Sequence, residues 1–212
     1  MKKILKFLLY VIPVSCLLSP VSLFASVDNA LVARAEIYLN AVTGLSGDFI
    51  QTANGKQDRG QFTMLRPGRV RLDYVGAPIQ LISDGKDLYF FDKSLDQITT
   101  VPLTSTPAGI LVRKNIDLRN ADIKVTNTDA DTIPGTFSLT MQLKDNPGLG
   151  KMTVTFDNNP VKLNSWTVID ATGNKTDVQF KNLTVKTNFD KNWFQIGRHK
   201  TVSTSGGDSF YE

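Results

Sequence analysis

Apolar and polar side chains alternate through the middle of the chain, which reads Gly60-Gln61-Phe62-Thr63-Met64-Leu65-Arg66-Pro67-Gly68-Arg69-Val70-Arg71-Leu72-Asp73-Tyr74 and, a few residues later, Pro78-Ile79-Gln80-Leu81-Ile82-Ser83-Asp84-Gly85-Lys86-Asp87-Leu88-Tyr89-Phe90-Phe91-Asp92. Asp84-Gly85 separates two apolar runs and is typical of a tight hairpin turn, because glycine adopts positive φ without a Cβ clash. Arg66-Pro67-Gly68 marks another turn, since proline fixes φ and glycine relieves strain. This segment is therefore predicted to be an antiparallel meander.

The same pattern of short apolar segments extends over most of the chain. Clusters of Asn, Asp, Gly and Pro separate segments that predict strands at 45–52, 60–65, 69–75, 79–83, 88–92, 97–103, 123–128, 136–144, 151–156, 163–170 and 176–185. One amphipathic helix is predicted over 28–42, capped by Asp28 or Asn29 and ended by Gly44, and a shorter helical piece over 107–113. A single curved antiparallel sheet or barrel, with both helical pieces packed against it, accounts for this order.

The N-terminal residues 1–25 have the layout of a secretory signal peptide, with Lys2, Lys3 and Lys6 before an apolar run. We expect cleavage after Ala25 and a single domain over 26–212. The alternative is a lipoprotein that begins at a lipidated Cys16, although the residues around this cysteine fit that role poorly. Loss of the three lysines lowers the net charge from +4 to +1, so the composition gives no case for nucleic-acid binding. Arg69 and Arg71 alternate with apolar residues, as on a solvated strand face.

No set of residues in the sequence explains catalysis. The one histidine, His199, lies in a polar tail without partners at metal-ligand spacing, and the only cysteine lies in the expected signal. Nucleophile, phosphate-loop and metal-binding motifs are absent from the sequence. We therefore expect a binding protein without cofactor or metal. A hydrolase with two carboxylates that meet only in the fold stays an alternative.

The central segment resembles the LolA family, the periplasmic carriers of outer-membrane lipoproteins. The resemblance rests on Gly60, Phe62, Arg66-Pro67, the strand that ends at Tyr74, Pro78, Ser83-Asp84-Gly85-Lys86 and the aromatic strand 89–92. It is weaker over 47–52 and from Thr106-Pro107 to Lys114-Asn115, and beyond Met141 only the architecture is similar. The closing segment 188–196 resembles the family's final strand but lacks the proline-rich ending, which leaves its contacts with the releasing machinery open.

The resemblance implies a mainly β fold with flanking helices: an incomplete, open antiparallel β-barrel covered by a helical lid. It implies that Arg66 is a latch between sheet and lid, for which the fixed donors of arginine are suited. Large apolar side chains at alternating strand positions fill a core or line an acyl-chain cavity. The candidates for the cavity are Leu39, Phe49, Phe62, Leu72, Tyr74, Ile82, Leu88, Phe90, Ile110, Leu111, Met141, Met152, Phe156 and Trp166.

The partners implied by the resemblance are acylated lipoprotein cargo, an inner-membrane ABC-type exporter similar to LolCDE, and an outer-membrane acceptor similar to LolB. The protein would act in the periplasm as a monomer. Two related functions stay open at this point. One is a lipid-anchored acceptor similar to LolB, which a lipidated Cys16 would support. The other is a periplasmic sensor of lipoproteins similar to RseB, although such sensors carry a second domain.

Overall fold

The computed structural model describes residues 27–119, 122–130, 133–190, 192–196 and 201–202. The predicted signal peptide, its cleavage position, Cys16 and His199 lie outside the described residues. Within them, most of the chain forms β-strands, and one α-helix, α1 (Asn29–Ala41), precedes all of them. No helix among the described residues is long and apolar enough to cross a membrane.

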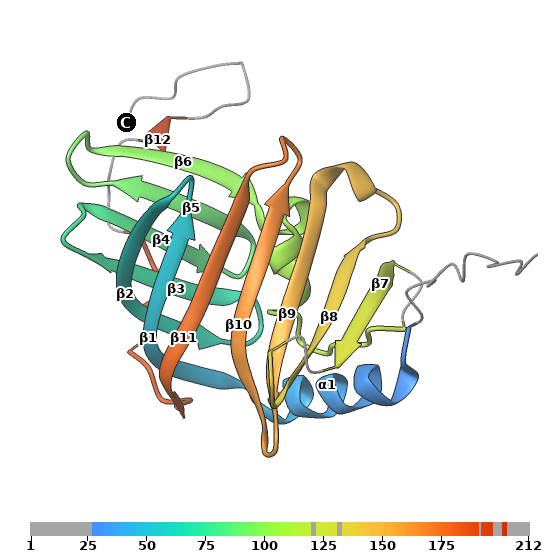
Figure 1. Cartoon of the computed structure of the whole chain (residues 1–212). Helices are drawn as coiled ribbons and strands as arrows, with labels where there is room; N and C mark the ends of the chain where they lie inside the picture. Colours follow the sequence, from blue (N-terminus) through green and yellow to red (C-terminus); the bar gives the residue numbers. More distant parts are fainter. Residues whose placement is uncertain (1–26, 120–121, 131–132, 191, 197–200, 203–212) are drawn as a thin grey trace, which may run out of the picture.

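All described strands belong to one open sheet (Figure 1). Its order is β12-β6-β5-β4-β3-β2-β1-β11-β10-β9-β8-β7. The bounds are β1 Gly44–Ala53, β2 Lys56–Leu65, β3 Arg69–Val75, β4 Ile79–Asp84, β5 Asp87–Asp92, β6 Gln97–Pro102, β7 Ile123–Ala130, β8 Thr136–Leu143, β9 Gly150–Asn158, β10 Val161–Asp170, β11 Lys175–Val185 and β12 Thr201–Val202.

Two meanders make up the sheet, and β1 joins them by pairing with β11. Every neighbouring pair is antiparallel except β12 and β6, which are parallel. The two ends of the order, β7 and β12, do not pair with each other, so the described strands form an incomplete barrel. The predicted fold class, an open antiparallel barrel with a helical cover, is confirmed.

Helix α1 covers the concave face of the sheet beside β8 and β10 (Figure 1). Asp28 caps it, because the carboxylate Oδ1 accepts a hydrogen bond of 2.7 Å from the backbone N–H of Ala30. Val32, Ala35 and Leu39 recur every three or four residues and are buried. This spacing places them on one helix face, which packs onto the sheet.

The second helical piece is shorter than predicted. Leu103–Ser105 and Pro107–Ile110 form two 3₁₀ turns, η1 and η2, and residues 111–119 continue without a helix. The predicted helical piece over 107–113 is therefore a 3₁₀ turn that begins at Pro107 as expected and ends three residues early, at Ile110. So few residues cannot recover the cost of nucleating an α-helix. We call the whole segment 103–119 the lid loop.

Two turns differ from the prediction in detail. At the β4–β5 hairpin, Asp84 is the last residue of the strand, and Gly85 and Lys86 form the turn, with φ of 110° at Gly85. The turn is thus shifted by one residue. Strand β2 begins at Lys56 and not at Gly60, because Asn54 and Gly55, both with positive φ, form a two-residue turn after β1.

Candidate functional site

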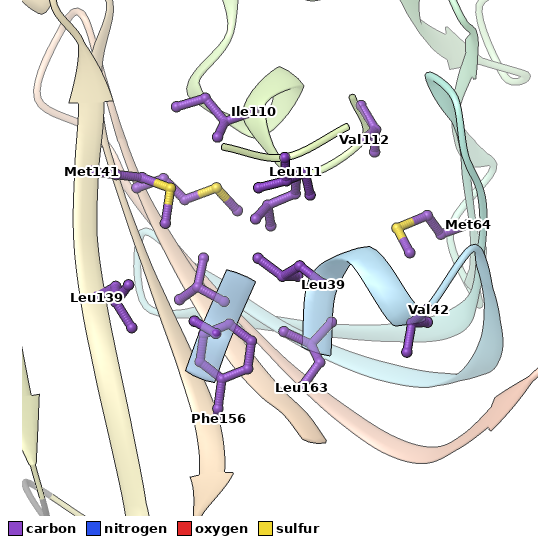
Figure 2. Close-up of a cluster of buried hydrophobic side chains, with 14 of the residues drawn as sticks. Leu39, Val42, Met64, Ile110, Leu111, Val112, Leu139, Met141, Phe156 and Leu163 are labelled. Atoms are coloured by element: carbon purple, nitrogen blue, oxygen red, sulfur yellow. The ribbon is translucent and has the colours of Figure 1, made fainter. Parts of the chain in front are cut away.

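The concave face of the sheet has a packed half and a hollow half. In the packed half, α1 lies over β8 to β10, and Figure 2 shows Leu39, Leu139, Met141, Phe156 and Leu163 gathered there. Their side chains are at most 6% exposed. This close packing makes that half the structural core, although Leu39 and Leu163 at its edge also line a small void beside α1.

The hollow half contains a mostly apolar cavity of about 400 Å³. Its walls come from β3 to β6 and from β10 and β11, and the lid loop forms its roof. The apolar wall residues include Val70, Leu72, Tyr74, Leu81, Leu88, Val101, Leu103, Leu111, Trp166, Val168 and Val178. A methylene group takes up roughly the volume of a water molecule, about 30 Å³ in the liquid, so the cavity has room for on the order of a dozen of them.

Aromatic rings form the floor of this cavity. Phe49 on β1 and Tyr74 on β3 meet edge to face with ring centroids 5.0 Å apart. Gly60 lies between them on β2, paired with both, and a side chain there would collide with the Phe49 ring. The absence of a Cβ at Gly60 therefore allows the two rings to meet across the strand.

Tyr74 combines an apolar ring with one polar contact. Its hydroxyl donates a hydrogen bond of 2.8 Å to the side-chain oxygen of Gln51, which also lines the cavity. Burial raises the pKa of Tyr74 to about 12. The hydroxyl is therefore neutral at ordinary pH, and the floor carries no charge at this point.

Trp166 is the largest side chain in the wall. It meets Phe62 edge to face with centroids 5.7 Å apart and Phe180 with centroids 4.6 Å apart. The three rings come from β10, β2 and β11, which are close to one another in the sheet. This cluster closes the cavity on the side toward the C-terminal end of α1.

Arg66 ties the β2–β3 turn to the end of α1. Its Nε donates a hydrogen bond of 3.1 Å to the backbone carbonyl of Val42, and Nη2 donates to the same oxygen. The side chain is only 8% exposed, and this burial lowers the pKa of the guanidinium from its usual value. Nη1 has no hydrogen-bond partner among the described residues. Arg66 thus binds one carbonyl, at the C-terminal end of α1, and not several carbonyls of the cover.

Two further contacts join the lid loop to the turn and to α1. The amide of Gly68, next to the Arg66 turn, donates to the carbonyl of Val112 over 2.7 Å. On the helix, the Asn40 side chain both donates to the carbonyl of Ile116 (2.7 Å) and accepts from its amide (3.0 Å). Glu36 accepts from the amide of Leu118 and pairs with Arg119 at 2.8 Å. Helix and lid loop are therefore linked as one cover.

The structure divides the predicted cavity residues into separate groups. Leu72, Tyr74, Leu88, Leu111 and Trp166 line the cavity. The core contains Leu39, Phe49, Phe62, Ile110, Met141, Met152 and Phe156, and of these Phe49 and Phe62 contact the rings of the cavity residues Tyr74 and Trp166. Phe90 shares the face of Leu88 but is 41% exposed and does not line the cavity. The residue types were right for an apolar interior, but the sequence did not separate core from cavity.

Ile82 lies on the opposite, convex face of the sheet. It pairs with Arg71, whereas the preceding residue, Leu81, pairs with Leu72 in the cavity wall. On the convex face, Arg71 donates a hydrogen bond of 2.8 Å to the carbonyl of Trp193 and its guanidinium lies 4.8 Å from the centroid of that ring. The C-terminal segment therefore contacts this face, and Arg71 is not on a purely solvated strand face.

Several cavity residues were missed by the sequence analysis. Val70, Leu81, Val101 and Val178 line the wall together with the predicted residues. Each is at an even spacing from, or directly opposite, a predicted wall residue, as Val70 is two positions before Leu72 and Val101 pairs with Leu88. The period of two in a strand could have identified them.

Comparisons with known proteins agree with this architecture. A family profile described as "Outer membrane lipoprotein carrier protein LolA" matches residues 40–197. Among curated relatives, an outer-membrane lipoprotein carrier protein of Chromohalobacter salexigens is 29% identical over 199 residues, which cover 87% of this chain and 92% of the relative. One of the same description from Neisseria meningitidis serogroup C is 25% identical and covers 84% and 88%.

Among solved structures, an uncharacterized conserved protein of Thermus thermophilus superposes with a TM-score of 0.50 at 9% identity. The superposition covers 83% of this chain and 99% of that protein, and it shows a shared fold. The family profile covers well over half of the 212 residues, including the hollow half of the sheet and the lid loop. The chain therefore belongs to the LolA family of outer membrane lipoprotein carrier proteins.

Proposed function

We propose that this protein carries lipoproteins between the inner and the outer membrane and shields their acyl chains in the cavity under the lid loop. The observation that carries the proposal is the apolar hollow of about 400 Å³ on the concave face, roofed by the lid loop. Burial of one methylene contributes about 0.8 kcal/mol, so a chain of about fourteen methylenes gains on the order of 11 kcal/mol. That gain is large enough to withdraw an acyl chain from water.

The size of the cavity favours a cover that moves. The hollow has room for about one chain of on the order of a dozen methylenes, whereas a triacylated lipoprotein carries three chains. Binding of the whole anchor then requires the cover to open. Arg66 is placed to control this step, because it holds the end of α1 through the carbonyl of Val42. In this proposal the acyl chains displace that contact on binding, and the contact forms again after release.

The proposed route begins at an inner-membrane ABC-type exporter similar to LolCDE and ends at an outer-membrane acceptor similar to LolB. The protein acts in the periplasm as a monomer, and the transfer needs neither a cofactor nor a catalytic residue. The names of the relatives, outer-membrane lipoprotein carrier proteins, support the transport of lipoproteins in this proposal. Direct transfer from one apolar cavity to the next avoids exposing the acyl chains to water, which would cost the free energy gained on burial.

Mass spectrometry of the protein recovered from the periplasm tests the proposal. We expect a chain without covalent lipid that carries a co-purified triacylated polypeptide. A variant with Leu88→Asp, which places a charge in the cavity wall, should recover less of this cargo. The matched control is Val75→Lys, which adds a charge at an exposed end of β3 outside the cavity. If the wild-type protein, Leu88→Asp and Val75→Lys were all recovered without cargo, the carrier function would be contradicted. A lipid on Cys16 would favour an anchored acceptor.

A further inference from the structure

A second hollow lies at the other end of β10 and β11. It measures about 430 Å³, and its walls come from the C-terminal half of α1, the start of β1 and these two strands. Apolar side chains form much of its surface: Tyr38, Val42, Leu45, Val161, Leu163, Phe180, Leu183 and Val185. Asp157, Lys162, Asn164 and Asn182 add polar groups. We call this hollow the distal groove.

The cavity and the distal groove share two strands. Along β11, Thr176 and Val178 line the cavity, and Phe180 and Asn182 line the distal groove. Along β10, Trp166 lines the cavity and Leu163 the groove. The two hollows therefore follow one another along the sheet, and the paired rings of Trp166 and Phe180 stand between them.

A small void lies between the two hollows. Its volume is about 10 Å³, close to the space of one water molecule. Leu111 and Trp166 line both this void and the cavity. Tyr38, Val42, Leu45 and Leu163 line both the void and the distal groove. Only a few side chains thus separate the two hollows.

We propose that the distal groove takes the far end of a long acyl chain, which passes from the cavity through the position of this void. The inference rests on the proposed carrier function and extends its binding site. In the closed state the acyl chain can occupy only the cavity. When the end of α1 moves away from the sheet, Tyr38 and Val42 move with it, and the two hollows become one apolar channel.

Arg66 lies at the point where the passage opens. It lines the void, and its guanidinium binds the carbonyl of Val42, a residue that lines the void as well. Leu39, Val42, Met64 and Leu111 also line the void, and Figure 2 shows the first three below Leu111 of the lid loop. Release of Val42 would therefore both loosen α1 and widen the passage. The same contact would control the closing of the lid and the length of chain that the protein accepts.

The dimensions of β11 set the chain length at which the groove is reached. From Thr176 the strand rises about 13 Å to Phe180 and about 20 Å to Asn182, at about 3.3 Å per residue. A polymethylene chain advances about 1.1 to 1.2 Å per bond, as an extended backbone does over its three bonds per residue. A dodecanoyl chain that starts near Thr176 thus ends at the ring barrier, whereas an octadecanoyl chain extends into the distal groove.

Photo-crosslinking with two acyl probes tests this inference. A short peptide is acylated at its N-terminus with a dodecanoyl or an octadecanoyl chain that carries a diazirine at its far end, and the labelled residues are mapped by mass spectrometry. We expect the shorter probe to label the cavity side of the ring barrier, at residues such as Trp166 or Val178. The longer probe should label the groove, at Leu163, Leu183 or Val185.

Equilibrium binding of the same two peptides gives an independent readout. Leu183→Lys should weaken binding of the octadecanoyl peptide at least tenfold and leave the dodecanoyl peptide within twofold. Val185→Lys, at a position that is 71% exposed, serves as a second groove variant that should fold normally. Ile37→Lys is the matched control, because Ile37 is also 71% exposed but lies on α1 away from the groove lining.

Two results would overturn the distal groove as a binding site. One is an octadecanoyl probe that labels only cavity or lid-loop residues, and the other is an equal effect of both groove variants on the two peptides. The carrier function would survive either result, because the cavity would still bind the chain. Failure of both peptides to bind saturably would instead contradict the proposed function itself.

Discussion

Replacement of Arg66 by leucine should open the cover without unfolding the sheet. Arg66 donates to the carbonyl of Val42 through Nε and Nη2, and both atoms lie in a buried environment. Hydrogen bonds from a charged group contribute about 1.5 to 3 kcal/mol net. Because each 1.4 kcal/mol is a factor of about ten in an equilibrium constant, the population of the open form should rise about 10- to 150-fold.

Hydrogen exchange measured by mass spectrometry is the assay for this change. In the closed form the amide of Gly68, in the β2–β3 turn, donates to the carbonyl of Val112 in the lid loop. Its exchange should accelerate by the same factor of about 10 to 150 in Arg66→Leu, because this bond joins the sheet to the cover and breaks when the cover opens. Amides in the middle of β9 should keep their wild-type rates, since this strand is paired with β8 and β10 within the sheet.

Two variants make the result specific to the guanidinium. Arg66→Lys keeps the charge but replaces the fork of donors by one ammonium group, so it should accelerate exchange to an intermediate extent. Arg69→Leu removes an exposed arginine three residues away and should leave exchange unchanged. If the Gly68 amide exchanged at the wild-type rate in Arg66→Leu, or if this variant bound and released lipoprotein normally, the latch function would be refuted.

Three further predictions concern the cover, the floor and the wall of the cavity. Asn40→Ala removes both hydrogen bonds to Ile116 and should destabilise the protein by about 1 to 3 kcal/mol, seen as a lower midpoint of thermal unfolding; an unchanged midpoint would contradict the link. Burial raises the pKa of Tyr74 from 10.0 to about 12, so its contribution is complete below pH 10 and is lost as the pH rises toward 12. Over this range wild type should lose about 2 to 3 kcal/mol more than Tyr74→Phe in denaturant titrations, and parallel curves would argue against the shift. Leu88→Asp should weaken binding of an acylated peptide at least tenfold with Val75→Lys unaffected, and equal loss in both would indicate a general effect on the fold.

Local signals in the sequence were sufficient for the strands and for the class of fold. Strand β3 was predicted with the bounds that the structure shows, and most others within two residues, because apolar alternation and turn residues are local properties. The Asn54-Gly55 turn carried an equally strong signal that the analysis did not use. The second helical piece failed for a local reason too, since its few apolar residues do not distinguish 3₁₀ turns from an α-helix.

The candidate site was only partly accessible from the sequence. Alternation places Leu72 and Tyr74 on one face of β3, but it does not say which face is concave or which apolar positions the helix covers. For this reason Met141 and Leu88 appeared equivalent in the sequence, although one is packed in the core and the other lines a hollow. Arg66 was singled out through the family resemblance, and its bond to Val42 depends on the position of α1.

By itself, the sequence determined an antiparallel β-protein with one capped helix, and its central motif identified the family. The tertiary structure decided where space remains. Pairing of β1 with β11 joins two meanders that are distant in the chain and curves them around a common face, and α1 fills only one half of that face. A void is a difference between the volume enclosed by the sheet and the volume of the side chains inside it. Because that difference depends on all the packed elements together, no local pattern of residues can determine it.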